Sequence, residues 1–241
     1  MFDLHCHFIP GIDDGARNMD DALALLKLSV DEGITHIVAT PHINPGYFDN
    51  TLEIIQAGLA ELKAAASENG INVQLAAAAE VRLCAELPVW IANHQLPFLG
   101  EYQGKKVLLL EFPHSHIPVG ADKLVKWLMT KNVLPMIAHP ERNREIQKDI
   151  SKLAPFRRAG CLTQLTASSI IGDMGDVSFS TAMALLEQKA FDIVATDSHS
   201  INRRPPKLHD AKQVIAERFG DDYAEQLTTT TPAAISQVLF I

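Results

Sequence analysis

The sequence predicts an α/β protein with a parallel sheet, and three observations lead to this class. Apolar segments of strand length alternate with segments of helical periodicity seven times along the 241 residues. The strand segments are continuously apolar, which indicates burial on both faces and therefore parallel pairing. Polar, ionisable residues follow six of the seven segments. Repeated βα units of this kind form either a barrel with one strand fewer than the common eight or an open doubly wound sheet.

The predicted elements follow one another without a repeat, a low-complexity run or a linker, so we expect one domain over residues 1–241. Strands are expected at 2–6, 35–40, 71–79, 105–110, 133–138, 161–166 and 191–196. Helices are expected at 20–32, 51–69, 84–93, 121–131, 144–158, 178–188 and 207–219, with two short ones near Ala224 and Ala233. Gly33 and Gly70 follow the first two helices, as is typical of helix ends.

Composition excludes several classes of protein. Hydrophobic residues make up 47% of the chain, which favours a large folded core over disorder. The net charge of -8 argues against non-specific nucleic-acid binding. No apolar run approaches the roughly 20 residues of a membrane span, and no signal peptide is recognisable. Cys6, Cys84 and Cys161 are scattered, as expected for reduced thiols in a cytoplasmic protein.

The opening His5-Cys-His7 follows an apolar strand. Because side chains alternate along a strand, both imidazoles point to one face and Cys6 points to the other. Two imidazoles on one face can bind one metal ion. Asp13 and Asp14 come after a Pro-Gly turn, close enough in sequence to add an oxygen ligand.

Other strands end in similar residues. In parallel barrels the carboxyl ends of the strands meet at one rim. The ionisable residues expected at this rim are His5, His7, His42, Glu80, Glu111, His139, Glu141, Asp197 and His199. Burying so many ionisable groups together is costly unless a counter-charge is present, and divalent cations would supply it. Imidazoles and carboxylates without thiolates suit manganese, iron or zinc, with Glu80 or Glu111 as the bridging ligand.

Arginines occur at the same rim. Arg142 follows His139, and Arg203 and Arg204 follow His199. Guanidinium forks match phosphate oxygens, so metals and arginines together indicate a phosphate ester as substrate. The metals would generate a hydroxide nucleophile, and the arginines would hold the phosphoryl group.

These motifs resemble those of the polymerase and histidinol phosphatase (PHP) family. They are His5-x-His7, Asp14-Gly15, Thr40-Pro41-His42, Glu80, Glu111, His139-Pro140-Glu141-Arg142 and Asp197-Ser198-His199. The opening His-Cys-His-x-x-Pro-Gly-x-Asp-Asp-Gly, the Ala-His-Pro-Glu-Arg segment and the Arg-Pro-Pro segment are similar to the bacterial tyrosine-protein phosphatase branch. That branch is linked to capsule and exopolysaccharide synthesis, and the resemblance covers residues 2 to 206.

The resemblance implies a distorted (β/α)7 TIM-like barrel, the PHP fold, forming one metal-dependent phosphatase domain. It also implies three divalent ions, expected to be manganese with iron and zinc as alternatives. By motif, the three ions would be held by His5, His7, Glu80 and Asp197; by Glu80, Glu111 and His139; and by Asp14, His42 and His199. The partition of the two glutamates stays open. Arg142 and Arg204 would bind phosphate, but the adjacent Arg203 leaves open which of that pair does so.

The implied activity is hydrolysis of phosphotyrosine in a protein through a trinuclear metal-bound hydroxide. The implied partner is an autophosphorylated bacterial tyrosine kinase with a tyrosine-rich tail. A tyrosine leaving group has a pKa near 10, so at most a weak general acid is needed. No cysteine is followed six residues later by arginine, which excludes the cysteine-dependent tyrosine phosphatases.

Three alternatives stay open. The first is a PHP phosphatase of a small ester such as histidinol phosphate. The second is an amidohydrolase, a family that usually bridges its metals with a modified lysine, whereas Glu80 and Glu111 end the middle strands here. The third is a non-enzymatic metal-holding or kinase-binding module. His114-x-His116 is either a substrate contact or an ordinary loop pair. We expect no membrane insertion, and a dimer or a larger homo-oligomeric ring is left open.

Overall fold

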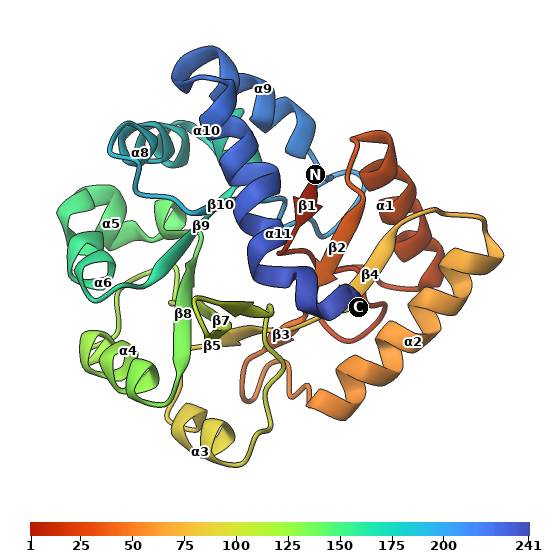
Figure 1. The fold of residues 1–241 in the computed structure, drawn as a ribbon, viewed down its shortest axis with the longest axis horizontal. Coiled ribbons are helices and arrows are strands. Elements are labelled where there is room, and N and C mark those ends of the chain that lie inside the picture. The colour runs from red at the N-terminus through yellow and green to blue at the C-terminus, as the bar shows by residue number, and fades with distance from the viewer.

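A ring of parallel strands lies at the centre of the computed structural model, which describes residues 1–241, and helices surround it (Figure 1). The strands are β1 (Phe2–Asp3), β2 (His36–Ala39), β3 (His42–Ile43), β4 (Gln74–Ala77), β5 (Glu80–Arg82), β6 (Glu101–Tyr102), β7 (Lys105–Glu111), β8 (Val133–Ala138), β9 (Leu162–Thr166) and β10 (Ile193–Ala195). They pair in the orders β1-β2-β4 and β10-β9-β8-β7-β5-β3, and all of these pairs are parallel. Only β6 is antiparallel, and it pairs with β7.

Backbone hydrogen bonds join the two sets of strands into one ring. The predicted strands over 35–40 and 71–79 correspond to β2 and β4, and each is followed, after a break, by a further short strand that was not predicted, β3 and β5 respectively. Across this break the Ala78 amide donates to the Ala39 carbonyl at 2.8 Å, so the pairing continues. At the other junction the Asp197 amide donates to the His5 carbonyl at 2.7 Å, and the His7 amide donates to the Ser198 carbonyl at 2.9 Å. The predicted distorted (β/α)7 barrel is therefore confirmed.

The helices form the outer layer because each buries one apolar stripe against the ring. They are α1 (Met19–Asp31), α2 (Leu52–Glu68), α3 (Leu87–Ala92), α4 (Ala121–Thr130), α5 (Arg144–Lys148), α6 (Ala154–Arg158), α7 (Ala167–Ile170), α8 (Asp176–Glu187), α9 (Leu208–Phe219), α10 (Asp221–Glu225) and α11 (Thr231–Ser236). Side-chain caps fix the starts of the two helices that follow the first strands. Asn18 accepts the Asp21 amide, and Thr51 accepts the Ile54 amide.

Some predicted bounds were wrong. The expected helix over 144–158 is interrupted, because Asp149 adopts an extended conformation (φ -153°, ψ 96°) and its side chain accepts the Ser151 amide. Local side-chain acceptance of this kind competes with helix continuation. The helix expected from residue 84 begins only at Leu87. The first strand is paired with β2 only at Phe2–Asp3, and α7 was not anticipated.

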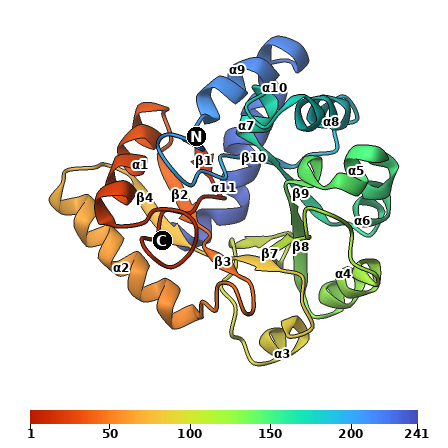
Figure 2. The same ribbon diagram turned by 180° about the vertical axis from the view of Figure 1, so that it is seen from behind.

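The interior of the ring is filled with apolar side chains from most of its strands. Leu4, Val38, Leu109 and Met136 are each 0–1% exposed in this cluster. Ile235 of α11 packs into the same cluster. Figure 1 shows the C-terminal segment (blue) crossing the ring, and Figure 2 shows the opposite end, where the loops after the strands gather. One end of the barrel is thus closed by α11, and the other presents the polar loops.

None of the helices combines the length and the apolar character that a membrane crossing requires.

Candidate metal centre

The carboxyl ends of the strands deliver ionisable side chains to one pocket of about 150 Å³. The sequence-predicted residues that line it are Asp14, His42, Glu80, Glu111, His139, Arg142, Asp197, His199 and Arg204. His5 and His7 lie beneath them, fully buried, and both touch Glu80. Arg203 is exposed and does not line this pocket. All nine predicted metal ligands (His5, His7, Asp14, His42, Glu80, Glu111, His139, Asp197 and His199) therefore gather in one place.

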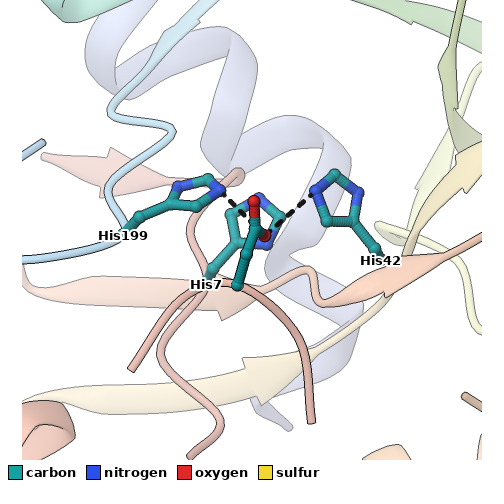
Figure 3. A group of neighbouring side chains, drawn as sticks. His7, His42 and His199 are labelled. Carbon is teal, nitrogen blue, oxygen red and sulfur yellow. Dashed lines mark ion pairs between the residues drawn. The ribbon is translucent and has the colours of Figure 1, made fainter. Parts of the chain in front are cut away.

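The ligand atoms form four overlapping groups, and within each group they all lie within 4.8 Å of one another. The groups are His7-Asp14-His42-His199, His5-His7-Glu80, His5-His139-Asp197 and His42-Glu80-Glu111. Figure 3 shows His7, His42 and His199 approaching from different parts of the barrel rim. The Nε2 atoms of His42 and His199 each lie 3.4 Å from Asp14 Oδ1. Overlap between the groups means that several residues can serve neighbouring ions.

Glu80 occupies the middle of the cluster. Its Oε2 lies 3.3 Å from His5 Nε2 and 3.0 Å from His42 Nδ1. Its Oε1 lies 2.7 Å from His139 Nε2. A carboxylate with both oxygens facing different imidazoles has the geometry expected of a bridging ligand.

Neighbouring groups hold the imidazoles of His5 and His7 in one orientation. Gln164 Oε1 accepts the His139 amide at 3.1 Å, so this atom must be the amide oxygen. The same oxygen lies 3.0 Å from His5 Nδ1, which must then carry the proton. Asp13 Oδ2 lies 2.7 Å from His7 Nδ1. In both rings this leaves Nε2 free to face the cluster, which is the arrangement that metal-binding histidines require.

Burial and charge in the cluster fit a site for divalent cations. Burial and the adjacent Glu80 carboxylate raise the pKa of Glu111 to about 8. Glu80 Oε2, Glu111 Oε2 and His42 Nδ1 are buried without a hydrogen-bond partner. Buried acceptors left without donors are rare, and bound cations would satisfy them. Imidazole nitrogen and carboxylate oxygen donors without a thiolate suit manganese, iron or zinc.

Two of the predicted arginines face the pocket. Arg142 and Arg204 both donate to the carboxylate of Asp197. Burial raises the pKa of Asp197, but Arg204, His5 and Arg142 outweigh it and hold that pKa well below its usual range. The two guanidinium groups thus line the pocket next to the cluster of imidazoles and carboxylates.

Arg82 lines the same pocket and was missed by the sequence analysis. Its Nη2 lies 2.9 Å from Glu111 Oε2 and forms an ion pair with that carboxylate. The signal was present in the sequence, because Arg82 stands two residues after Glu80 on one short strand and therefore on the same face.

Two residues near His139, His114 and Glu141, have contacts that the sequence did not predict. His114 lines the pocket, its ring stacks on His139 with centroids 5.5 Å apart, and its Nε2 lies 3.0 Å from the guanidinium of Arg142. His116 is exposed and does not reach the pocket. Glu141, although at a strand end, is fully buried and accepts from the Thr166 amide and the Ser169 hydroxyl. Glu141 thus supports the turn that carries His139 and Arg142.

Comparison with known proteins gives consistent results. The family model described as "Capsular polysaccharide synthesis, CpsB/CapC" matches residues 1–237. Tyrosine-protein phosphatase YwqE of Bacillus subtilis (strain 168) is 32% identical over 228 residues, covering 95% of this chain and 89% of that protein. The putative tyrosine-protein phosphatase CapC of Staphylococcus aureus is 33% identical over 227 residues, covering 94% of this chain and 87% of that protein.

A solved structure agrees in fold over nearly the whole chain. It comes from a study of YwqE from Bacillus subtilis and CpsB from Streptococcus pneumoniae, described as "unique metal-dependent tyrosine phosphatases". The TM-score is 0.92 at 31% sequence identity, covering 98% of this chain and 94% of that one. Given the family match over residues 1–237, this chain belongs to the CpsB/CapC family of capsular polysaccharide synthesis.

Proposed function

We propose that this chain is a metal-dependent protein-tyrosine phosphatase, a phosphoric monoester hydrolase that releases phosphate from phosphotyrosine in a protein. One observation carries the proposal: a buried cluster of imidazoles and carboxylates shares a pocket with the guanidinium groups of Arg142 and Arg204. The names of the relatives YwqE and CapC support the choice of phosphotyrosine.

We propose three divalent ions as cofactors, with manganese as the expected metal. Their ligands would be His5, His7, Asp14, His42, Glu80, Glu111, His139, Asp197 and His199. When bound, such ions supply Lewis acidity and make a water molecule acidic enough to act as a nucleophile near neutral pH. The central position of Glu80, with oxygens 2.7 Å and 3.0 Å from two different imidazoles, supports its assignment as the bridging ligand.

The protein's own groups would bind and orient the phosphoryl group. Arginine forks donate two parallel hydrogen bonds to phosphate oxygens, and this fixes the direction from which phosphorus can be attacked. Arg142 and Arg204 face the pocket, whereas Arg203 is exposed, so we assign phosphate binding to Arg204 and not to Arg203. Charge that develops on the phosphoryl oxygens would be stabilised by these fixed cations. Departure of a phenolate with a pKa near 10 needs little help from a general acid.

We further propose that the phosphoprotein is an autophosphorylated bacterial tyrosine kinase involved in capsule or exopolysaccharide synthesis. The family match to capsular polysaccharide synthesis supports this partner. Because that match extends over residues 1–237, we also propose that the chain acts as one phosphatase domain.

The proposal is tested with protein stripped of metal by a chelator and reloaded with Mn²⁺. Phosphate release is compared for a phosphotyrosine peptide, a phosphoserine peptide and histidinol phosphate. We expect manganese-dependent release from the phosphotyrosine peptide, its loss in Arg204→Ala, and near-normal release in the matched control Arg203→Ala. Preference for histidinol phosphate would replace the proposed substrate with a small ester. No release from any substrate by metal-loaded protein would refute phosphatase activity.

A further inference from the structure

A second cavity lies next to the metal centre, on the other side of Phe48. We call it the Phe48 groove, and its volume is about 340 Å³. Its lining residues are Ile43, Pro45, Phe48, Asp49, Asn50, Thr51, Leu52, Glu53, Trp90, Asn93, His94, Gln95 and Leu96. Phe48 lines both cavities, and its ring stacks on His42 with centroids 5.3 Å apart. The groove is therefore separated from the metal centre by one aromatic ring.

Part of the lining of the Phe48 groove is apolar. Ile43 and Leu96 form buried parts of the lining, at 3% and 5% exposure. Phe48 and Trp90 are half-buried. Figures 1 and 2 both show α2 and α3, which carry residues of this lining, on either side of β3. Such a lining fits the hydrocarbon part of a side chain.

The charges of the groove are opposite to those of the metal centre's arginines. The lining contains the carboxylates of Asp49 and Glu53, both exposed, and neither lysine nor arginine. The neighbouring pocket presents Arg82, Arg142 and Arg204. The arginines of the metal centre favour an anion. The carboxylates and apolar residues of the Phe48 groove favour a cation with an apolar stem.

We propose that the Phe48 groove binds a lysine or arginine side chain of the phosphoprotein, close in sequence to the phosphotyrosine. This rests on the proposed function and adds a specificity subsite to it. The methylene stem would lie against Phe48 and Trp90, and the cation would face Asp49 and Glu53. The stacked rings of Phe48 and His42 lie between the two occupants, so van der Waals contacts across both rings separate them by about 10–11 Å. An extended chain covers that distance in about three residues.

The loop that carries Phe48 also favours contact with a polypeptide. Tyr47 precedes Phe48 in this loop and is 82% exposed. The loop is held in shape by the Asn44 amide donating to the Phe48 carbonyl at 3.0 Å, and by Asp49 accepting the Gly46 amide at 2.8 Å. Because these hydrogen bonds already order the loop, its contact with a polypeptide would cost little further conformational entropy.

The test compares kcat/KM for phosphotyrosine peptides that carry lysine, alanine, leucine or glutamate about three residues from the phosphotyrosine. Because two exposed carboxylates would face one cation, we expect kcat/KM to be about fivefold higher for the lysine peptide than for the alanine peptide. The preference should decrease in high salt. In Asp49→Asn/Glu53→Gln the ratio should fall to near one, while p-nitrophenyl phosphate is hydrolysed as in the wild type. Asparagine retains the acceptor for the Gly46 amide, so the loop is preserved.

The matched control is Glu61→Gln/Glu68→Gln, which removes two exposed carboxylates from α2 outside the groove and should leave the ratio unchanged. Equal kcat/KM for all four peptides in the wild type would overturn the groove proposal and leave the phosphatase proposal intact. A preference for leucine or glutamate would also overturn it, because a different occupant would be indicated. Absence of release from every phosphotyrosine peptide would instead refute the proposed function itself.

Discussion

Gln164 offers a sharp test of how the metal centre is built, because it touches two proposed ligands without being one itself. It is fully buried on β9, and its Oε1 accepts from the His139 amide at 3.1 Å and from His5 Nδ1 at 3.0 Å. Leucine has nearly the same volume as glutamine but no hydrogen-bond acceptor, so Gln164→Leu removes the hydrogen bonds to His139 and His5. The backbone of His139 and the ring of His5 would then lose the contacts that orient them.

The expected magnitude follows from those two contacts. Each buried donor left without an acceptor costs about 1–3 kcal/mol, so the free energy of unfolding should fall by roughly 2–6 kcal/mol. Loss of the group that fixes a metal-binding histidine typically weakens metal affinity by about 10–100-fold. The affinity for Mn²⁺ should therefore decrease by at least about tenfold, and activity at limiting Mn²⁺ should decrease with it.

Calorimetric titration of the stripped protein with Mn²⁺ measures the affinity, and urea unfolding in chelator measures the stability. Gln164→Glu is the matched control, because a carboxylate retains the acceptor and the Nε2 that it replaces has no hydrogen-bond partner. We expect this control to bind Mn²⁺ within a few-fold of the wild type. Folded Gln164→Leu protein with unchanged Mn²⁺ affinity would refute the idea that Gln164 sets the orientation of His5.

Three further predictions concern phosphate binding, packing and metal. Arg142→Lys retains the charge but loses the planar fork, so KM for a phosphotyrosine peptide should rise about tenfold. Metal content should stay unchanged by elemental analysis, and a loss of metal would contradict the assignment. Gly15→Ala would put a Cβ 2.1 Å from the His7 carbonyl oxygen, so the free energy of urea unfolding should fall by about 1–3 kcal/mol, and unchanged stability would show that the loop moves freely. Free Mn²⁺ at 100 times its dissociation constant should stabilise the stripped protein against thermal unfolding by about 2.7 kcal/mol for each ion bound, and an unaltered melting temperature would argue against a metal site.

Much of the candidate site is determined by short-range sequence pattern. Alternation along a strand directs His5 and His7 to one face, and the parallel arrangement brings every strand's carboxyl end to the same rim. The nine proposed ligands could therefore be predicted to lie together, and they do. Helix bounds that depend on local caps, such as α2 after Thr51, were also close.

Other features depend on contacts between residues far apart in the chain, and only the tertiary structure decides them. Gln164 reaches His5 across 159 positions, although no ionisable residue directly follows its strand, the one expected at 161–166. Adjacent Asp13 and Asp14 are divided between two tasks, one holding the His7 ring and the other facing His42 and His199. Strand curvature and ring closure set these pairings, and neither is encoded in the periodicity of a single segment. The sequence by itself thus determined which chemistry gathers at the rim, while the closed barrel decided which side chain orients which.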